Sequence, residues 1–210
     1  AEAIAAARPD LVILHVNFAP FAANLEQALG TPVALFEIKS VNDVATKLHL
    51  FGRLTGKADA ADAAIASLRQ QLDAITVEAP ATEAPILALF GTPEAFFAYR
   101  RTSYLGSMIE RLGAENVAAD ADAARGMQSV APLNLEQAVA RQPDVILVVP
   151  HGPRGAVMAY LTRHPAWAQI KAVRDGRIHV LDESLFSSNP GPRAPQAMRE
   201  LKSMLDPAPQ

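Results

Sequence analysis

The chain has 210 residues, half of them hydrophobic, with 19 basic and 22 acidic residues and a net charge of −3. Its charges are spread along the sequence, which argues against a nucleic-acid surface with a clustered basic patch, and no apolar run reaches the ~18 residues of a membrane span. Cysteine is absent, which excludes disulfides, thiolate catalysis and Cys-ligated metal sites.

Hydrophobic patterning predicts alternating helices and strands. In the first half we expect a helix over 1–8, a strand over 11–14, a helix over 17–30, a strand over 33–38, helices over 40–54 and 59–76, and a linker over 78–85. In the second half we expect strands over 86–91, 95–99, 145–149 and 178–181, and helices over 104–112, 136–142, 155–163 and 192–205, with Pro192 at the first position of the last helix. The first helix opens without a cap or a signal-type segment, so we expect further chain before it. This alternation predicts an α/β fold with largely parallel sheets.

A motif of Glu, six residues and Pro-Asp occurs twice in the chain. Glu2 opens one copy and Glu136 opens the other, 134 positions later. Each copy reads as a short helix, a Pro-Asp turn and an aliphatic strand, because proline disfavours the helical conformation at the residue before it. The repeat predicts two lobes of similar build.

The second copy leads into the most informative corner of the sequence, Pro-His-Gly at positions 150–152. The strand before it is apolar throughout, which is typical of a strand buried on both faces of a parallel sheet. Ligands of open α/β sheets lie beyond the carboxyl ends of the strands, and neutral imidazole is a good iron ligand. His151 is therefore a candidate ligand-binding residue; the alternative is a loop histidine that caps a helix or faces water. The repeat places Asn17 at the equivalent position of the first lobe, and His15 reads as a hydrogen-bonded residue near that strand end.

Two such lobes joined by a long helix resemble the ABC-importer binding proteins that serve iron-siderophore, haem and cobalamin uptake. The resemblance is carried by the two Glu-x6-Pro-Asp units, the segments 102–106 and 112–117, and Gly-Pro-Arg at 191–193. It implies two Rossmann-like lobes with largely parallel sheets joined by one long interdomain helix, and a ligand in the cleft between the lobes. The implied domains are an incomplete N-terminal lobe over 1–56, an interlobe helix and linker over 57–80, and a C-terminal lobe over 81–210.

Within this class the chain is most similar to the haem-receptor lipoproteins of Gram-positive surface haem-uptake systems. The similarity rests on the segments 91–93 and 104–106, the Pro-His-Gly-Pro corner and Trp167. It implies that His151 is an axial ligand of haem iron. The partner methionine of those receptors corresponds to a position before Ala1, so it has no number here. Met127 is a candidate substitute.

Further ligand-binding residues are expected around His151. Aromatic walls for a porphyrin would come from Phe18, Tyr99, Tyr104 and Phe186, and each of these is equally suited to a core. Anionic groups of the ligand would meet Arg100 and Arg101, which precede a helix start, and Arg193 at the start of the last helix. The alternatives are a solvated charge pair and a structural salt bridge.

The two motif glutamates form a second set of candidates. In the family, such glutamates lie on the outer surface, one per lobe, and dock onto arginines of the membrane permease. Glu2 and Glu136 are the matching residues here. An acidic residue at a helix start also has a local reason, since it stabilises the helix by ~0.3–1 kcal/mol.

We therefore expect a monomeric substrate-binding protein that delivers haem or another iron complex to an ABC permease dimer. It would be periplasmic or extracellular, anchored as a lipoprotein if Gram-positive, and would have no catalytic cofactor. The alternative within the class is a ferric-siderophore or cobalamin receptor. A bare-metal receptor needs converging ligands, and the five histidines are scattered. An α/β enzyme is disfavoured because Gly-x-Ser-x-Gly, a Gly-rich phosphate loop and cysteine are missing.

Overall fold

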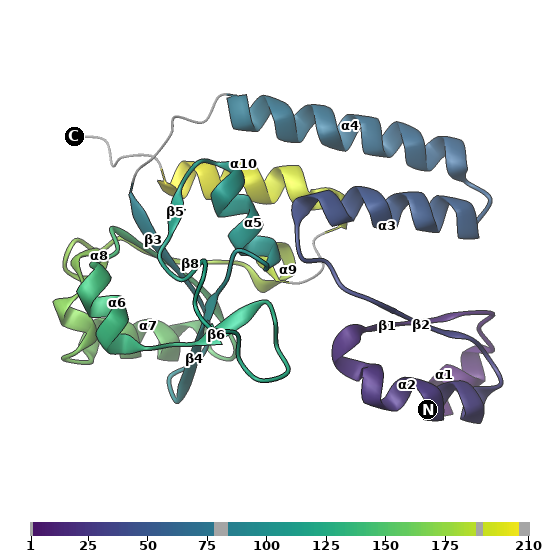
Figure 1. Ribbon diagram of the computed structural model, residues 1–210, viewed down its shortest axis with the longest axis horizontal. Helices are drawn as coiled ribbons and strands as arrows, with labels where there is room; N and C mark the ends of the chain where they lie inside the picture. The colour runs from purple at the N-terminus through teal and green to yellow at the C-terminus, as the bar shows by residue number, and fades with distance from the viewer. Residues whose placement is uncertain (1, 78–83, 188–190, 206–210) are drawn as a thin grey trace. The chain divides into compact units, whose positions relative to one another are not determined.

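The computed structural model describes residues 2–77, 84–187 and 191–205 (Figure 1). The chain forms two compact units, Ala1–Ile38 and Lys39–Gln210. The predicted linker falls largely on positions 78–83, outside the described residues. The expected lobe boundaries at 56 and 80 stay a prediction, and the helix that follows residue 40 belongs to the second compact unit.

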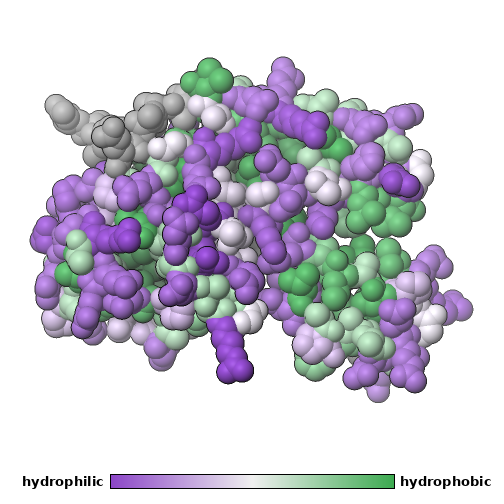
Figure 2. All heavy atoms as spheres, viewed as in Figure 1, coloured by the Kyte–Doolittle hydropathy of each residue, from purple (hydrophilic) through white to green (hydrophobic). Residues whose placement is uncertain are grey.

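The first unit is a helix–strand alternation around a two-stranded parallel sheet. Its elements are α1 (Glu2–Ala7), β1 (Val12–His15), η1 (Val16–Phe18), α2 (Ala19–Leu29) and β2 (Val33–Phe36). Strands β1 and β2 pair in parallel from Val12↔Val33 to His15↔Phe36. Apolar atoms gather on the surface of this unit in the space-filling view (Figure 2), and the exposed large apolar side chains are Ile13, Phe18, Phe21 and Leu35.

A mostly parallel sheet forms the centre of the second unit. Its strands are β3 (Pro85–Thr92), β4 (Ala95–Tyr99), β5 (Glu115–Asn116), β6 (Val130–Pro132), β7 (Val145–Pro150) and β8 (Ile178–Val180). The order is β6-β4-β3-β7-β8, with β5 paired to β3. Pairs β3–β5, β3–β7 and β7–β8 are parallel, whereas β4 runs antiparallel to β3 and β6. All six residues of β7 are buried, which agrees with the unbroken apolar run in the sequence.

Helices cover both faces of this sheet. The first face carries α6 (Leu135–Arg141), α7 (Arg154–Arg163), η2 (Trp167–Gln169) and α8 (Lys171–Arg174) (Figure 1). The second face carries α5 (Tyr104–Arg111), α9 (Glu183–Phe186), η3 (Gly191–Arg193) and α10 (Ala194–Leu205). The hydrophobic core on the first face contains Leu87, Leu89, Ile146 and Val148 of the sheet together with Trp167. Because side chains alternate along a strand, the buried neighbours Ile86 and Ala88 point to the second face. The α/β prediction is confirmed.

Two long helices form an antiparallel hairpin in the same unit. They are α3 (Val41–Leu54) and α4 (Ala58–Val77), and α4 also packs against α10. Ser40 begins α3 with a capping box, in which its side chain accepts from the Asp43 N–H and Asp43 in turn accepts from the Ser40 N–H. At Gly52 an added Cβ would lie 2.4 Å from the Cβ of Ala61, so glycine permits the close approach of the two helices.

The two copies of the repeat share an unusual backbone conformation. Arg8 and Gln142, which precede the two Pro-Asp turns, have φ angles of 45° and 44°. Both lie in the left-handed region, which non-glycine residues rarely adopt, so the turn leaves the helix in the same way in each copy. The last helix differs from expectation. It begins at Ala194, and Pro192 lies in the short η3 turn before it.

Candidate functional site

The carboxyl ends of β3, β7 and β8 meet at one edge of the second unit, here called the carboxyl edge. Gly91 of β3 lies beside Pro150 of β7, and the His151 N–H donates to the Gly91 carbonyl at 2.8 Å. This bond extends the strand pairing by one residue and fixes the backbone that carries the imidazole. The His151 side chain is exposed. Gly152 follows with φ of 121°, a conformation that glycine accepts at no steric cost.

Two arginines lie at the carboxyl edge. Arg154 opens α7 and donates from Nη2 to the Val180 carbonyl at 2.7 Å. Arg193 donates from Nη2 to the Ser184 carbonyl at 2.6 Å. Both guanidinium groups help to hold the pKa of Asp182 below its usual value, although the larger causes are the hydrogen bonds from Ser184. Their hydrogen bonds go to uncharged oxygens, including the Ser184 hydroxyl for Arg193, and Asp182 is the carboxylate whose charge they share.

Arg154, Asp182 and Ser184 were missed in the sequence. A signal for Arg154 was present, because it stands three residues after His151 at the start of the next helix. Asp182 and Ser184 follow β8, a strand of three residues. The sequence gave no indication that β8 pairs with β7 and so brings these residues to the carboxyl edge.

Aromatic side chains line up along β3 and β4 on the second face of the sheet. The ring of Phe90 stacks on Phe97 at a centroid distance of 5.3 Å and lies 5.6 Å from the ring of Tyr99. Burial, and next the charge of Glu183, raise the pKa of the Tyr99 hydroxyl, which places that tyrosine near α9. Phe90 and Phe97 are half-buried and supply an apolar surface beside the carboxyl edge.

Two of the expected aromatic walls are core residues in this structure. Phe186 exposes 1% of its surface and Tyr104 exposes 3%. Burial raises the pKa of the Tyr104 hydroxyl, whereas the charge of Arg193 opposes that rise. The hydroxyl has no hydrogen-bond partner among the described residues. Arg193 and Tyr104 are therefore neighbours, but Tyr104 offers little surface to a ligand.

Arg100 and Arg101 are held by contacts away from the carboxyl edge. Arg100 donates to the carbonyls of Ala121 and Gln128 at 2.6 and 2.7 Å. Arg101 forms a two-pronged pair with Asp120 at 2.6 and 2.7 Å. Strand β4 runs back from Phe96, which lies opposite Gly91, so Arg100 is about 13 Å along the strand direction from that edge. The structure does not bring these two arginines to His151.

In the first unit, the candidates lie just after β1. The Asn17 N–H donates to His15 Nδ1 at 3.2 Å, so His15 is hydrogen-bonded as the sequence predicts. Asn17 and Phe18 belong to η1, and Phe18 exposes 53% of its surface. Glu2 is exposed in the first turn of α1.

The remaining histidines have local roles. His49 lies 3.5 Å from Asp62 across the α3–α4 hairpin, and His164 Nδ1 accepts from the Ala166 N–H. Burial, and next Arg177, lower the pKa of His179. Within residues 2–77, 84–187 and 191–205 there is no group of three or more metal-ligating side chains. None of the helices in those ranges combines the length and hydropathy of a membrane span.

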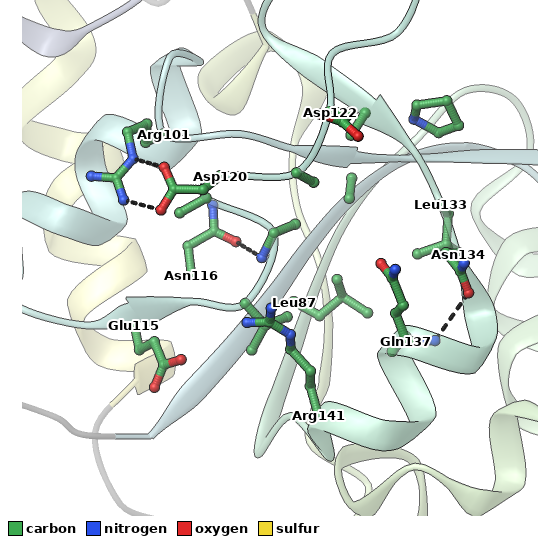
Figure 3. Close-up of a pocket in the computed structure, with 18 of the residues that line it drawn as sticks. Leu87, Arg101, Glu115, Asn116, Asp120, Asp122, Leu133, Asn134, Gln137 and Arg141 are labelled. Atoms are coloured by element: carbon green, nitrogen blue, oxygen red, sulfur yellow. Dashed lines mark hydrogen bonds and ion pairs between the residues drawn. The ribbon is translucent and has the colours of Figure 1, made fainter.

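A separate groove of about 1050 Å³ lies beside α6, on the first face of the sheet (Figure 3). We call it the α6 groove. Its walls are the segment 114–122 and helix α6, and its floor includes Leu87 and Ala98 of the sheet. Glu136, the predicted docking residue of the second lobe, is one of its lining residues. The groove shares no lining residue with the carboxyl edge.

Comparison with known proteins gives a family match and several similar proteins. Residues 1–185 match the periplasmic binding protein family. The high-affinity haem uptake system protein IsdE of Staphylococcus aureus is 28% identical over 120 residues, which are 55% of this chain and 39% of IsdE. The match therefore spans well under half the length of that curated relative.

Solved structures share the fold over almost the whole chain. An ABC transporter substrate-binding protein from Listeria monocytogenes EGD-e superposes with a TM-score of 0.85 at 22% identity, covering 97% of this chain and 79% of that one. The periplasmic haem-binding protein RhuT from Roseiflexus sp. RS-1 gives a TM-score of 0.81 at 25% identity, covering 97% and 78%. The family match over residues 1–185, most of the chain, shows that the chain belongs to the periplasmic binding protein family.

Proposed function

We propose that the chain is the substrate-binding component of an ABC importer and that it binds haem or a related iron complex, with His151 as an axial iron ligand. The observation that carries the proposal is the position of His151, whose backbone is fixed to Gly91 at the carboxyl edge while its imidazole is exposed. The similarity to IsdE and RhuT, which are described as haem uptake and haem-binding proteins, supports the same ligand. This role requires binding and release, without chemical turnover.

The carboxylates of haem would meet Arg154 and Arg193. Both guanidinium groups lie at the same edge as His151 and contact carbonyl oxygens. Arg pairs with carboxylates through two parallel hydrogen bonds, and the start of α7 adds N–H groups that favour an anion. Arg101 is less suited to this role, since Asp120 and Glu110 already neutralise it. Phe90 and Phe97 would supply the apolar contact that a porphyrin requires.

The proposed partner is a membrane permease that accepts the ligand from a monomeric binding protein outside the cytoplasm. Glu2 and Glu136 are exposed on first turns of equivalent helices in the two units. Such charges set the register and the association rate of a complex more than its affinity. We propose these two residues as the contacts to the permease.

A titration with haem tests the proposal directly. The chain is expected to give a stoichiometric complex with a sharpened Soret band, and His151→Ala is expected to weaken binding at least ~10-fold, because a direct iron ligand is removed. His49→Ala is the matched control, since His49 is exposed and belongs to the α3–α4 hairpin. Absence of a complex, or equal loss in both variants, would contradict the assignment of His151.

A ferric siderophore or cobalamin is the second candidate ligand. The specific observation in its favour is the pair of guanidinium groups at the carboxyl edge, which suits any polyanionic iron chelate. In a competition titration, a siderophore receptor would keep its affinity in His151→Ala and lose it in Arg154→Ala. A haem receptor would show the larger loss with His151→Ala.

A further inference from the structure

Two arginines and a carboxylate are gathered on the segment 180–184, which ends β8 and begins α9. Arg154 donates to the Val180 carbonyl at 2.7 Å, and Arg193 donates to the Ser184 carbonyl at 2.6 Å. Asp182 lies midway between these two contacts along the chain, and its Oδ1 accepts from the Ser184 N–H at 2.8 Å. The segment therefore fixes the two cations and the anion relative to one another.

The same segment continues the pairing of β8 with β7 up to the position of His151. Val180 pairs with Val148, and one further backbone hydrogen bond of 2.8 Å joins the two strands beyond that pair. Two residues further along this register, Asp182 comes level with Pro150, and neighbouring strands lie about 5 Å apart. Since His151 follows Pro150, the carboxylate and the candidate iron ligand belong to adjacent positions of the carboxyl edge.

Negative charge offsets the two guanidinium groups of this edge. Asp182 is exposed and stays ionised near neutral pH, because hydrogen bonds from Ser184, and to a smaller extent both guanidinium groups, hold its pKa below the usual value. The exposed Glu183 follows it, and the exposed Glu94 lies in the turn between β3 and β4. The edge therefore offers a ligand two local cations without a surplus of positive charge around them.

We propose that Asp182 is a specificity-determining residue, which favours iron complexes of low net charge with separate carboxylates, such as haem, and disfavours trianionic chelates. The inference rests on the proposed function, which supplies an iron complex at this edge. Each carboxylate of haem can meet one guanidinium group, and the ferric centre offsets part of its charge. A ferric tris-catecholate spreads its negative charge over its whole surface, so it meets Asp182 as well as the arginines. The repulsion grows in proportion to the charge of the ligand.

Calorimetric titration of the chain and of Asp182→Asn tests the proposal with ferric protoporphyrin IX, a trianionic ferric tris-catecholate and a neutral ferric trihydroxamate. Asparagine keeps an acceptor for the Ser184 N–H, so the start of α9 is retained. The unaltered chain is expected to bind haem at least ~10-fold more tightly than the tris-catecholate. Because Coulomb energy is proportional to charge, the variant is expected to gain about twofold for monoanionic haem and about eightfold for the trianionic chelate, with the trihydroxamate unchanged. Both gains are expected to shrink at high salt.

Asp122→Asn is the matched control, since it removes the same charge at an exposed position of the α6 groove, and it is expected to leave all three affinities unchanged. Equal gains for haem and the tris-catecholate, equal effects of the two variants, or a preference of the unaltered chain for the tris-catecholate would each overturn the proposal. If the trihydroxamate binds and haem does not, a selective gain of the tris-catecholate in Asp182→Asn would retain the role of Asp182 and contradict haem as the ligand. Failure of all three ligands to bind would overturn both.

Discussion

At the scale of single residues, the carboxyl edge fixes the backbone of a candidate ligand-binding residue while leaving its side chain exposed. His151 is held through its N–H, and the imidazole stays exposed. Metal ligands work best when the surrounding structure fixes their position before binding. The Gly91 carbonyl provides this support, and an added Cβ at Gly91 would lie 2.1 Å from the Ala95 carbonyl oxygen. The tight turn between β3 and β4 is therefore part of what positions the histidine.

Tyr104 gives a residue-scale prediction about stability. Its hydroxyl is buried and has no partner among the described residues. Leaving a buried polar group unpaired costs about 1–3 kcal/mol, so Tyr104→Phe is expected to raise the free energy of unfolding by about 1 kcal/mol. Urea unfolding followed by circular dichroism measures this change. Tyr160→Phe is the control at a half-buried tyrosine, where little change is expected. A destabilised Tyr104→Phe variant would show that the hydroxyl is hydrogen-bonded in solution.

At the scale of elements, the two left-handed residues are stabilised to different degrees. Gln142 donates from Nε2 to the carbonyls of Val139 and Gln169 at 2.6 and 3.1 Å, and its Oε1 accepts from the Lys171 N–H at 3.1 Å. One side chain thus connects the end of α6 to η2 and α8. In the first copy of the repeat, the Arg8 N–H donates to the Ala5 carbonyl at 3.1 Å. The shared backbone turn is reinforced by side-chain hydrogen bonds in the second copy.

This difference predicts unequal effects of the same substitution. Gln142→Ala keeps the backbone conformation but removes three hydrogen bonds, so it is expected to destabilise the chain by about 1–3 kcal/mol. Arg8→Ala has the same left-handed backbone and is the matched control, with an expected change below ~0.5 kcal/mol. Thermal unfolding of the two variants under identical conditions makes the comparison. Equal losses would contradict the structural role of the Gln142 amide.

The sequence predicted the elements that carry a strong local pattern. Strand β7 was evident from its unbroken apolar run, because both of its faces are buried, and the helix predicted over 40–54 matches α3. Strands β5 and β6 were missed because two or three residues contain no periodicity, and they exist through pairing with β3 and β4.

The same limit applies to the candidate site. His151 could be found from the strand before it, since its position depends on one element. Arg154 and Asp182 become neighbours through the pairing of β7 with β8, which the sequence does not display. Arg101 likewise pairs with Asp120 and Glu110, which lie in other segments of the chain. The ion pairs of Arg101 therefore depend on long-range contacts that the sequence does not display.

At the scale of the whole molecule, the two units differ in how much core each contains. The second unit has helices on both faces of a sheet, whereas β1 in the first unit buries only Val12 fully. Fewer than ~40 residues rarely supply enough buried surface for independent folding. The second unit is therefore expected to carry most of the stability of the chain.

A fragment of residues 39–210 tests this expectation. It is expected to unfold in a single cooperative transition with a denaturant midpoint close to that of the whole chain. A peptide of residues 1–38 is expected to be largely unstructured by circular dichroism. Hydrogen exchange on the whole chain gives an independent measure, with slower exchange expected in β3 and β7 than in β1. A fragment with a broad, non-cooperative transition would show that the second unit depends on the first.

The contact between Gly52 and Ala61 has a mechanical consequence. Since only the Ala61 methyl group lies between α3 and α4 at this point, a rotation that brings a larger side chain to this position would make the two helices collide. The hairpin is tied again at its turn, where the Lys57 N–H donates to the Gly52 carbonyl at 2.7 Å. We expect two helices joined at these two points to resist bending more than either helix would alone. Because α4 also packs against α10, we expect a displacement of α3 to move α4 and α10 with it rather than to be absorbed between α3 and α4.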